Sequence, residues 1–170
     1  KVVDELREKG MRLDLTLDAR RKTKDASRLE PSAFVIVASL EEALRYGPFD
    51  LALFALKSFD TQAALEGIKP FADKMPPILC LSNGVSNEPA IAEALGADKV
   101  IYGTVTSAIG RRGAGDIALE KLRGIGIANG NPLSAKLVAA FNAAYLNAQL
   151  FHDAAAMKWS KMLTNLIANP

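Results

Sequence analysis

The sequence has little of several residue types, and each shortage argues against a class of protein. A single cysteine, Cys80, leaves no partner for an internal disulfide and fits a reducing compartment. The sequence has 21 Lys and Arg and 19 Asp and Glu, a net charge of +2. It therefore lacks the excess of basic residues typical of a protein that binds nucleic acid or an anionic membrane. No apolar run approaches the roughly 18 residues of a membrane-spanning helix, and no signal-peptide pattern opens the chain. We therefore expect a cytoplasmic protein.

Two further absences concern chemistry. No group of side chains has the spacing of metal ligands, so no metal site is predicted. The one histidine, His152, stands beside Asp153 at the expected start of a helix, and we interpret it as a surface or capping residue. A G-x-G-x-x-G loop between a strand and a helix is also missing. The glycine-rich stretches Gly110–Gly115 and Gly124–Gly126 lack that setting and are interpreted as turns or close backbone approaches.

The two ends of the sequence lack features expected of a complete protein. No initiator Met precedes Lys1, and Pro170 follows directly on a helical pattern. The 170 residues, 49% of them hydrophobic, suffice for one domain with a core, or for one domain and part of a second. We interpret the chain as a fragment, which by itself is expected to be inactive.

The apolar pattern in the middle of the chain predicts an α/β fold. Asp50–Leu56, Pro77–Leu81 and Lys99–Tyr102 are short apolar runs typical of buried strands. Helical patterns separate them at Thr61–Lys74 and Asn87–Leu95, where Pro89 is tolerated in the first turn and Gly96 follows the end. Strands that alternate with helices at this spacing indicate βαβ units and a Rossmann-like parallel sheet.

Shorter elements flank this sheet. Strands are predicted at Met11–Leu17 and Phe34–Ala38, and a short helix at Leu40–Tyr46. Asp116–Leu119 and Gly124–Ala128 are predicted to form a β-hairpin or a small antiparallel addition.

Helices dominate the remainder of the chain. One is expected from Asn131-Pro132 to about Gln149, and Asp153 is expected to begin the last one. We therefore predict a partial dinucleotide-binding domain over residues 1–130, followed by the start of an all-helical C-terminal domain over residues 131–170.

Polar residues follow each predicted parallel strand, at Lys57-Ser58, Ser82–Gly84 and Gly103-Thr104. Ligands of open parallel sheets bind at the carboxyl ends of the strands. These segments are therefore candidates for a binding site, although strands commonly end in polar turn residues without any such function.

The last helix carries a polar stripe. Lys161, Asn165 and Asn169 are four residues apart, so they share one face. Asparagine is a poor helix former, which makes two in line with a lysine unusual. The stripe fits either a solvated helix face or a cation with two amides that contact a polar substrate.

Four segments in this order resemble the ketopantoate reductase family. They are Ala55–Thr61, Leu81–Glu88, Gly96–Thr104 and Trp159–Pro170, and together with the lysine–asparagine stripe they span nearly the whole chain. Ser86 departs from the pattern, because the family more often has a second glycine there. The family's glycine loop and its 2′-phosphate reader would precede Lys1.

The resemblance implies NADPH-dependent reduction of 2-dehydropantoate to pantoate, a step of pantothenate biosynthesis. By this match Lys57 and Asn83 would contact NADPH, and Asn83 would also face the substrate. Lys161 would be the general acid, with Asn165 and Asn169 binding the substrate. A ketone that accepts hydride becomes an alkoxide, which a placed ammonium can stabilise and protonate.

Two other functions stay open at this point. The protein could reduce another 2-keto acid, with NADH in place of NADPH, because the residues that would decide both lie outside the chain. It could also be a non-catalytic dinucleotide-binding module, although such a protein has no need of a placed acid like Lys161. Homo-oligomerisation is left undecided by the sequence.

Overall fold

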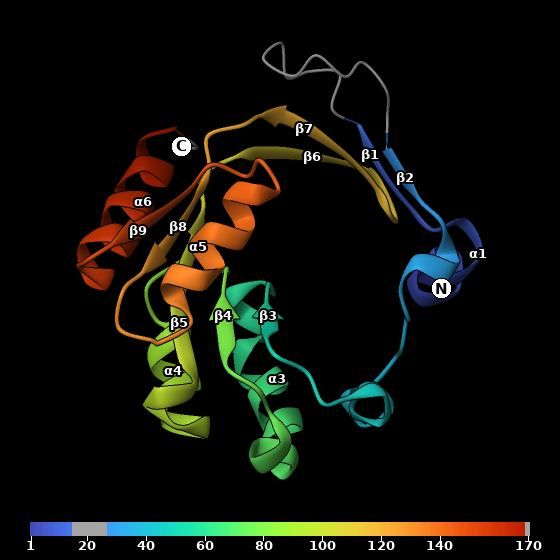
Figure 1. Cartoon of the computed structure of the whole chain (residues 1–170), viewed down its shortest axis with the longest axis horizontal. Coiled ribbons are helices and arrows are strands. Elements are labelled where there is room, and N and C mark those ends of the chain that lie inside the picture. Colours follow the sequence, from blue (N-terminus) through green and yellow to red (C-terminus); the bar gives the residue numbers. More distant parts are fainter. Residues whose placement is uncertain (15–26, 169–170) are drawn as a thin grey trace. The chain divides into compact units, whose positions relative to one another are not determined.

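The computed structural model describes residues 1–14 and 27–168, which form two compact units (Figure 1). The first unit combines Lys1–Tyr46 with Ser107–Arg123, and the second combines Gly47–Thr106 with Gly124–Pro170. The predicted domains, residues 1–130 and 131–170, stay a prediction.

The first unit is built on a four-stranded sheet in the order β2-β1-β7-β6. Strand β1 pairs antiparallel with β2 and parallel with β7, and β7 pairs antiparallel with β6. Asp14 on β1 is buried and accepts a hydrogen bond from Arg112 Nη1 on β6 at 2.6 Å. The elements of this unit are α1 (Val2–Lys9), β1 (Met11–Asp14), β2 (Ser27–Leu29), the 3-10 turns η1 (Pro31–Ala33) and η2 (Leu44–Tyr46), α2 (Leu40–Ala43), β6 (Ala108–Gly113) and β7 (Asp116–Lys121).

The second unit contains a five-stranded sheet in the order β3-β4-β5-β8-β9. Strands β3, β4 and β5 are parallel, β8 is antiparallel to β5, and β9 is parallel to β8. The strands are β3 (Ala52–Phe54), β4 (Ile78–Cys80), β5 (Val100–Val105), β8 (Ile125–Ala128) and β9 (Ala148–Phe151). The helices are η3 (Ser58–Asp60), α3 (Thr61–Ile68), η4 (Lys69–Lys74), α4 (Asn87–Leu95), η5 (Ala97–Lys99), α5 (Ser134–Ala143) and α6 (Ala154–Ala168).

Helices cover both faces of this sheet, and strand alternation divides the core between them. Ile78 and Cys80 on β4 pack with Leu65 of α3 and Ile91 of α4. Leu79, whose side chain points to the other face, joins the cluster that α5 covers. All three residues of β4 are buried, which explains why this strand has no polar position in the sequence. The predicted α/β class with parallel strands is confirmed.

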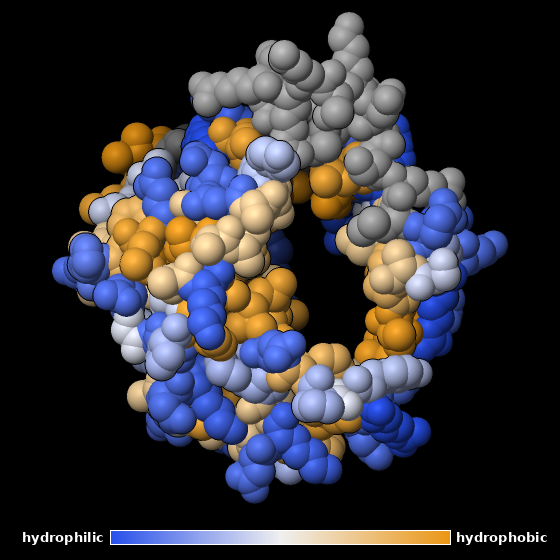
Figure 2. All heavy atoms as spheres, viewed as in Figure 1, coloured by the Kyte–Doolittle hydropathy of each residue, from blue (hydrophilic) through white to orange (hydrophobic). Residues whose placement is uncertain are grey.

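Helix α6 packs against β5 and β8. Asp153 begins it as predicted, since its Oδ1 accepts a hydrogen bond from Ala156 N at 2.9 Å. Gly126 on β8 allows the close approach, because a Cβ there would lie 2.9 Å from Met157 Sδ. The opposite side of α6 leaves apolar side chains at the surface (Figure 2), among them Leu163, Leu166 and Ile167.

Two predicted strands differ from the structure. Phe34–Ala38 is not a strand, and Val35 is 60% exposed, because no strand among the described residues pairs with this apolar run. Asp50–Leu56 is not covered on both faces. Only Ala52–Phe54 is extended in a ladder, at one end of its sheet, and Leu53 is 59% exposed. The predicted part of the first strand over residues 15–17 lies outside the described residues.

The C-terminal part also differs from the prediction. Asp116–Leu119 and Gly124–Ala128 do not form a hairpin with each other, since β7 pairs with β6 and β8 pairs with β5. The helix expected to reach Gln149 ends at Ala143, and β9 follows it. Asn142 explains the early end, because its side chain both donates to and accepts from the backbone of Ala148, at 3.0 and 2.7 Å.

Candidate active site

The ends of β3 and β4 are joined by a hydrogen-bond network around one carbonyl. Ser58 Oγ donates to Asn83 O at 2.7 Å, and Asn87 Nδ2 donates to the same oxygen at 2.7 Å. Thr61 Oγ1 at the start of α3 donates to Asn87 Oδ1 at 2.7 Å. Asn87 is 2% exposed, so this network is internal and holds the loop after β4 in place.

The loop presents Asn83 to solvent. Its backbone carbonyl is held by two donors, while the residue itself is exposed. Gly84 follows with a φ of 96°, a left-handed conformation that favours glycine. Lys57, also exposed, follows β3 and directly precedes η3. The structure therefore brings Lys57 and Asn83 to the carboxyl ends of neighbouring strands, as expected, while their roles stay predictions.

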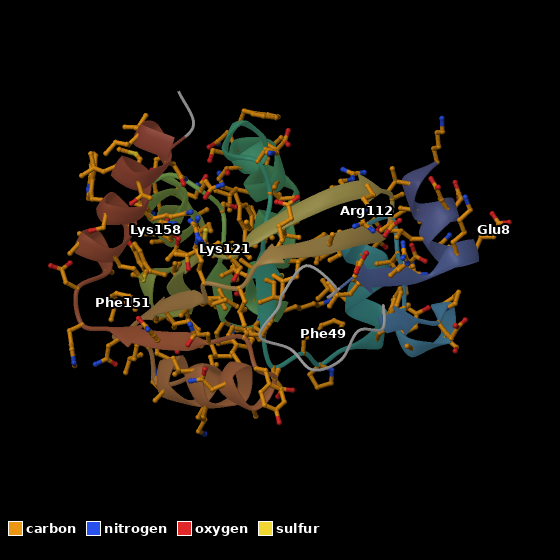
Figure 3. The ribbon with its side chains drawn as sticks, turned by 90° about the horizontal axis from the view of Figure 1, so that it is seen from above. Glu8, Phe49, Arg112, Lys121, Phe151 and Lys158 are labelled. Carbon is orange, nitrogen blue, oxygen red and sulfur yellow. The ribbon has the colours of Figure 1, made fainter. Side chains whose placement is uncertain are left out.

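A buried lysine that sequence reasoning missed connects α6 to this edge. The Lys158 side chain is 5% exposed and reaches from α6 toward the strands (Figure 3). Its Nζ lies 2.6 Å from Glu88 Oε1 and donates to Ser82 O at 2.9 Å and to Gly103 O at 3.2 Å. Glu88, on the first turn of α4, is fully buried.

The predicted polar stripe lies on nearly the same face of α6 as Lys158. At about 100° per residue, Lys161 and Asn165 lie within roughly 60° of Lys158 around the helix. Both are partly exposed, and Asn169 lies outside the described residues. The seven-residue spacing between Lys158 and Asn165 is the signal that could have added Lys158 to the stripe. The roles of Lys161, Asn165 and Asn169 stay predictions.

A cavity of about 250 Å³ opens beside Lys158. Its walls include Val85 and Pro89 before and in α4, Tyr102 on β5, and Trp159 on α6. Burial raises the pKa of the Tyr102 hydroxyl, and the nearby Glu88 carboxylate raises it further. The hydroxyl therefore stays protonated well into the alkaline range.

Cys80 lies in the same region and is fully buried. Burial raises the pKa of its thiol to about 12, and the Glu88 carboxylate acts in the same direction. Cys80 is therefore a core residue, as its place in the predicted buried strand Pro77–Leu81 implies, and low reactivity follows because the thiolate is the reactive form.

We expect the native protein to leave Cys80 unmodified by a thiol reagent at pH 8, whereas the denatured protein should react at once. Introducing a second cysteine by Ser32→Cys, at an exposed position, provides the control. Mass spectrometry of the double-cysteine protein should find one modified thiol, at residue 32. Equal labelling of both thiols in folded protein would contradict this.

The described residues, 1–14 and 27–168, lack two kinds of feature. They contain no cluster of His, Cys, Asp and Glu able to hold a metal ion. Over the same residues, no helix combines the length and the apolar character needed to cross a membrane. His152 is exposed, as expected for a surface residue.

A parallel sheet with polar loops at its carboxyl edge and a lysine-bearing helix beside them is an architecture suited to a dinucleotide-dependent oxidoreductase. The sequence model described as "Ketopantoate reductase PanE/ApbA" matches residues 1–131. The chain belongs to this family, whose members are NAD(P)-dependent oxidoreductases.

Individual relatives agree with this assignment. The 2-dehydropantoate 2-reductase of Halobacterium salinarum is 27% identical over 172 residues, which cover 96% of this chain and 51% of that protein. The structure of 2-dehydropantoate 2-reductase from Geobacter metallireducens GS-15 matches with a TM-score of 0.71 and 25% identity, over 94% of this chain and 50% of that one.

D-mandelate dehydrogenase in a ternary structure with NADH and anilino(oxo)acetate matches with a TM-score of 0.71 at 19% identity, over 96% of this chain and 50% of that one. At this identity the likeness concerns the fold alone. The chain spans about half the length of the curated relative it matches.

Proposed function

We propose that the protein reduces 2-dehydropantoate to pantoate with NADPH and that Lys161 is the general acid. Family membership supports the reaction type. The observation that carries the assignment of Lys161 is the anchor of α6. Lys158, one turn earlier on that helix, bonds to Ser82 O beside Asn83 and to Gly103 O on β5.

The residues at the strand ends fit a dinucleotide. Lys57 offers a cation and Asn83 an amide that both donates and accepts, and both are exposed at the carboxyl edge of a parallel sheet. These contacts would add to a glycine loop, which these 170 residues do not contain. When bound, NADPH supplies the hydride.

The side chains of α6 would act on the substrate. As hydride reaches the keto carbon, its oxygen gains negative charge, and the Lys161 ammonium stabilises that charge and donates a proton to the oxygen. Asn165 and Asn169 would hold the substrate carboxylate and hydroxyl groups by hydrogen bonds. The Asn83 amide would contact both the substrate and the cofactor.

The test is a steady-state assay of the whole protein against a panel of 2-keto acids with NADPH and NADH. We expect the highest kcat/KM for 2-dehydropantoate with NADPH. The panel includes the aromatic 2-keto acid that corresponds to mandelate, because a D-mandelate dehydrogenase shares the fold. A higher kcat/KM for that compound would refute the proposal. So would a protein that turns over none of the 2-keto acids in the panel.

A further inference from the structure

The Lys158 ammonium lies close to three oxygen atoms inside the protein, one in an ion pair and two as hydrogen-bond acceptors. The partners are the Glu88 carboxylate at 2.6 Å, Ser82 O at 2.9 Å and Gly103 O at 3.2 Å. They belong to three segments, namely the first turn of α4, the loop after β4, and β5. One ammonium therefore ties α6 to three separate parts of the carboxyl edge.

Stability alone is a poor reason to bury this pair. Removing two charges from water is costly, and apolar side chains of similar volume often serve as well or better. Side chains with large apolar parts stand nearby, since Tyr102 lines the same cavity as Lys158 and the buried Met157 precedes Lys158 on α6. An ion pair with two carbonyl partners fixes the orientation of α6 relative to the strand ends, which an apolar contact does not.

The orientation of α6 affects the placement of two candidate site residues. Ser82, whose carbonyl accepts from Lys158, directly precedes Asn83. Lys161 lies three residues beyond Lys158, or about 4.5 Å along the helix axis. The same ammonium therefore fixes the backbone beside Asn83 and the helix turn that leads to Lys161.

We propose that Lys158 and Glu88 are positioning residues that set Lys161 against the substrate held near Asn83. The role of Lys161 rests on the proposed function, whereas the anchoring of α6 by the ion pair does not. Without the anchor, α6 would still pack through Met157 against Gly126, but its rotation and height over the sheet edge would no longer be fixed.

The test compares Lys158→Met, Glu88→Gln and the double variant in the whole protein. Each single change leaves a buried group without its charged partner, so part of its effect is a loss of stability. The double variant removes both charges and should regain much of that stability. We expect kcat to stay at least tenfold below wild type in the double variant, with KM changed less than kcat.

The exposed ion pair between Lys69 and Glu66, at 2.7 Å, provides the matched control. Lys69→Met, Glu66→Gln and their double variant make the same chemical changes away from α6, and all three should keep wild-type kcat. A Lys158→Met/Glu88→Gln double variant whose kcat returns to within twofold of wild type would overturn the proposal, because the pair would then act on stability alone.

A second readout does not depend on turnover. Trp159, the single tryptophan of the sequence, follows Lys158 on α6, so its fluorescence reports the placement of this helix. We expect a shifted emission and faster amide hydrogen exchange in α6 of the double variant. Unchanged emission and exchange would refute the anchor itself, even if the wild-type protein reduced no 2-keto acid and the proposed function had failed.

Discussion

Replacing Lys161 with alanine in the whole protein should lower kcat by about a hundredfold or more, the usual contribution of a general acid. The ammonium would no longer stabilise the alkoxide or supply its proton, and no other group of α6 is proposed to do so. Affinity for NADPH should hardly change, because the proposed cofactor contacts, Lys57 and Asn83, lie at the strand ends.

The measurement is turnover and NADPH affinity of the folded variant, side by side. Lys136→Ala, which removes an exposed lysine from α5, is the control and should leave both unchanged. Asn165→Ala should act mainly on KM if the amide holds the ground-state substrate, and on kcat as well if its contact tightens in the transition state. Near-normal turnover of Lys161→Ala would mean that the stripe is a solvated helix face.

Local signals in the sequence predicted some elements well. Helix α4 spans Asn87–Leu95 as expected, because Pro89 suits a first helical turn and Gly96, with a φ of 104°, ends the helix. Strand β4 was recognisable because both of its faces are covered. These features depend on residues close together in the chain.

Features that depend on distant partners were not predictable in the same way. Phe34–Ala38 has the composition of a strand, but a strand also needs a neighbour to pair with. Strand β9 was hidden in a helical pattern, and it forms after a turn in which Tyr145 and Asn147 adopt positive φ values of 59° and 52°.

The residues of the candidate site also differ in how far the sequence alone could place them. Lys57 and Asn83 could be placed from the sequence, because residues that follow parallel strands meet at one edge. For Lys158 the sequence offers only its seven-residue spacing from Asn165, which places it on the face of the stripe but does not show burial, because a lysine within a helical pattern is usually exposed. Only the fold shows that Glu88, 70 residues earlier, comes within 2.6 Å of its Nζ.

Glu88→Ala should cost the whole protein about 3–5 kcal/mol of unfolding free energy, the usual effect of removing one partner of a buried ion pair. The Lys158 ammonium would remain 5% exposed with two carbonyl groups and no counter-charge. Among the described residues no backbone N–H donates to the Glu88 carboxylate, so Lys158 is the charge that compensates it. The loss should appear in urea unfolding as a lower midpoint with an unchanged slope.

The expected pattern across variants separates lost charge compensation from lost volume. Adding Lys158→Met to Glu88→Ala removes the stranded ammonium, so the double variant should be more stable than Glu88→Ala alone. Glu66→Ala, which breaks the exposed pair with Lys69, should change stability little because solvent screens that pair. Removing the Glu88 carboxylate should also lower the pKa of the Cys80 thiol from about 12, since that anion helps to raise it. A Glu88→Ala protein as stable as Glu66→Ala would show that Lys158 finds other compensation and that the buried charges are not coupled as the 2.6 Å contact implies.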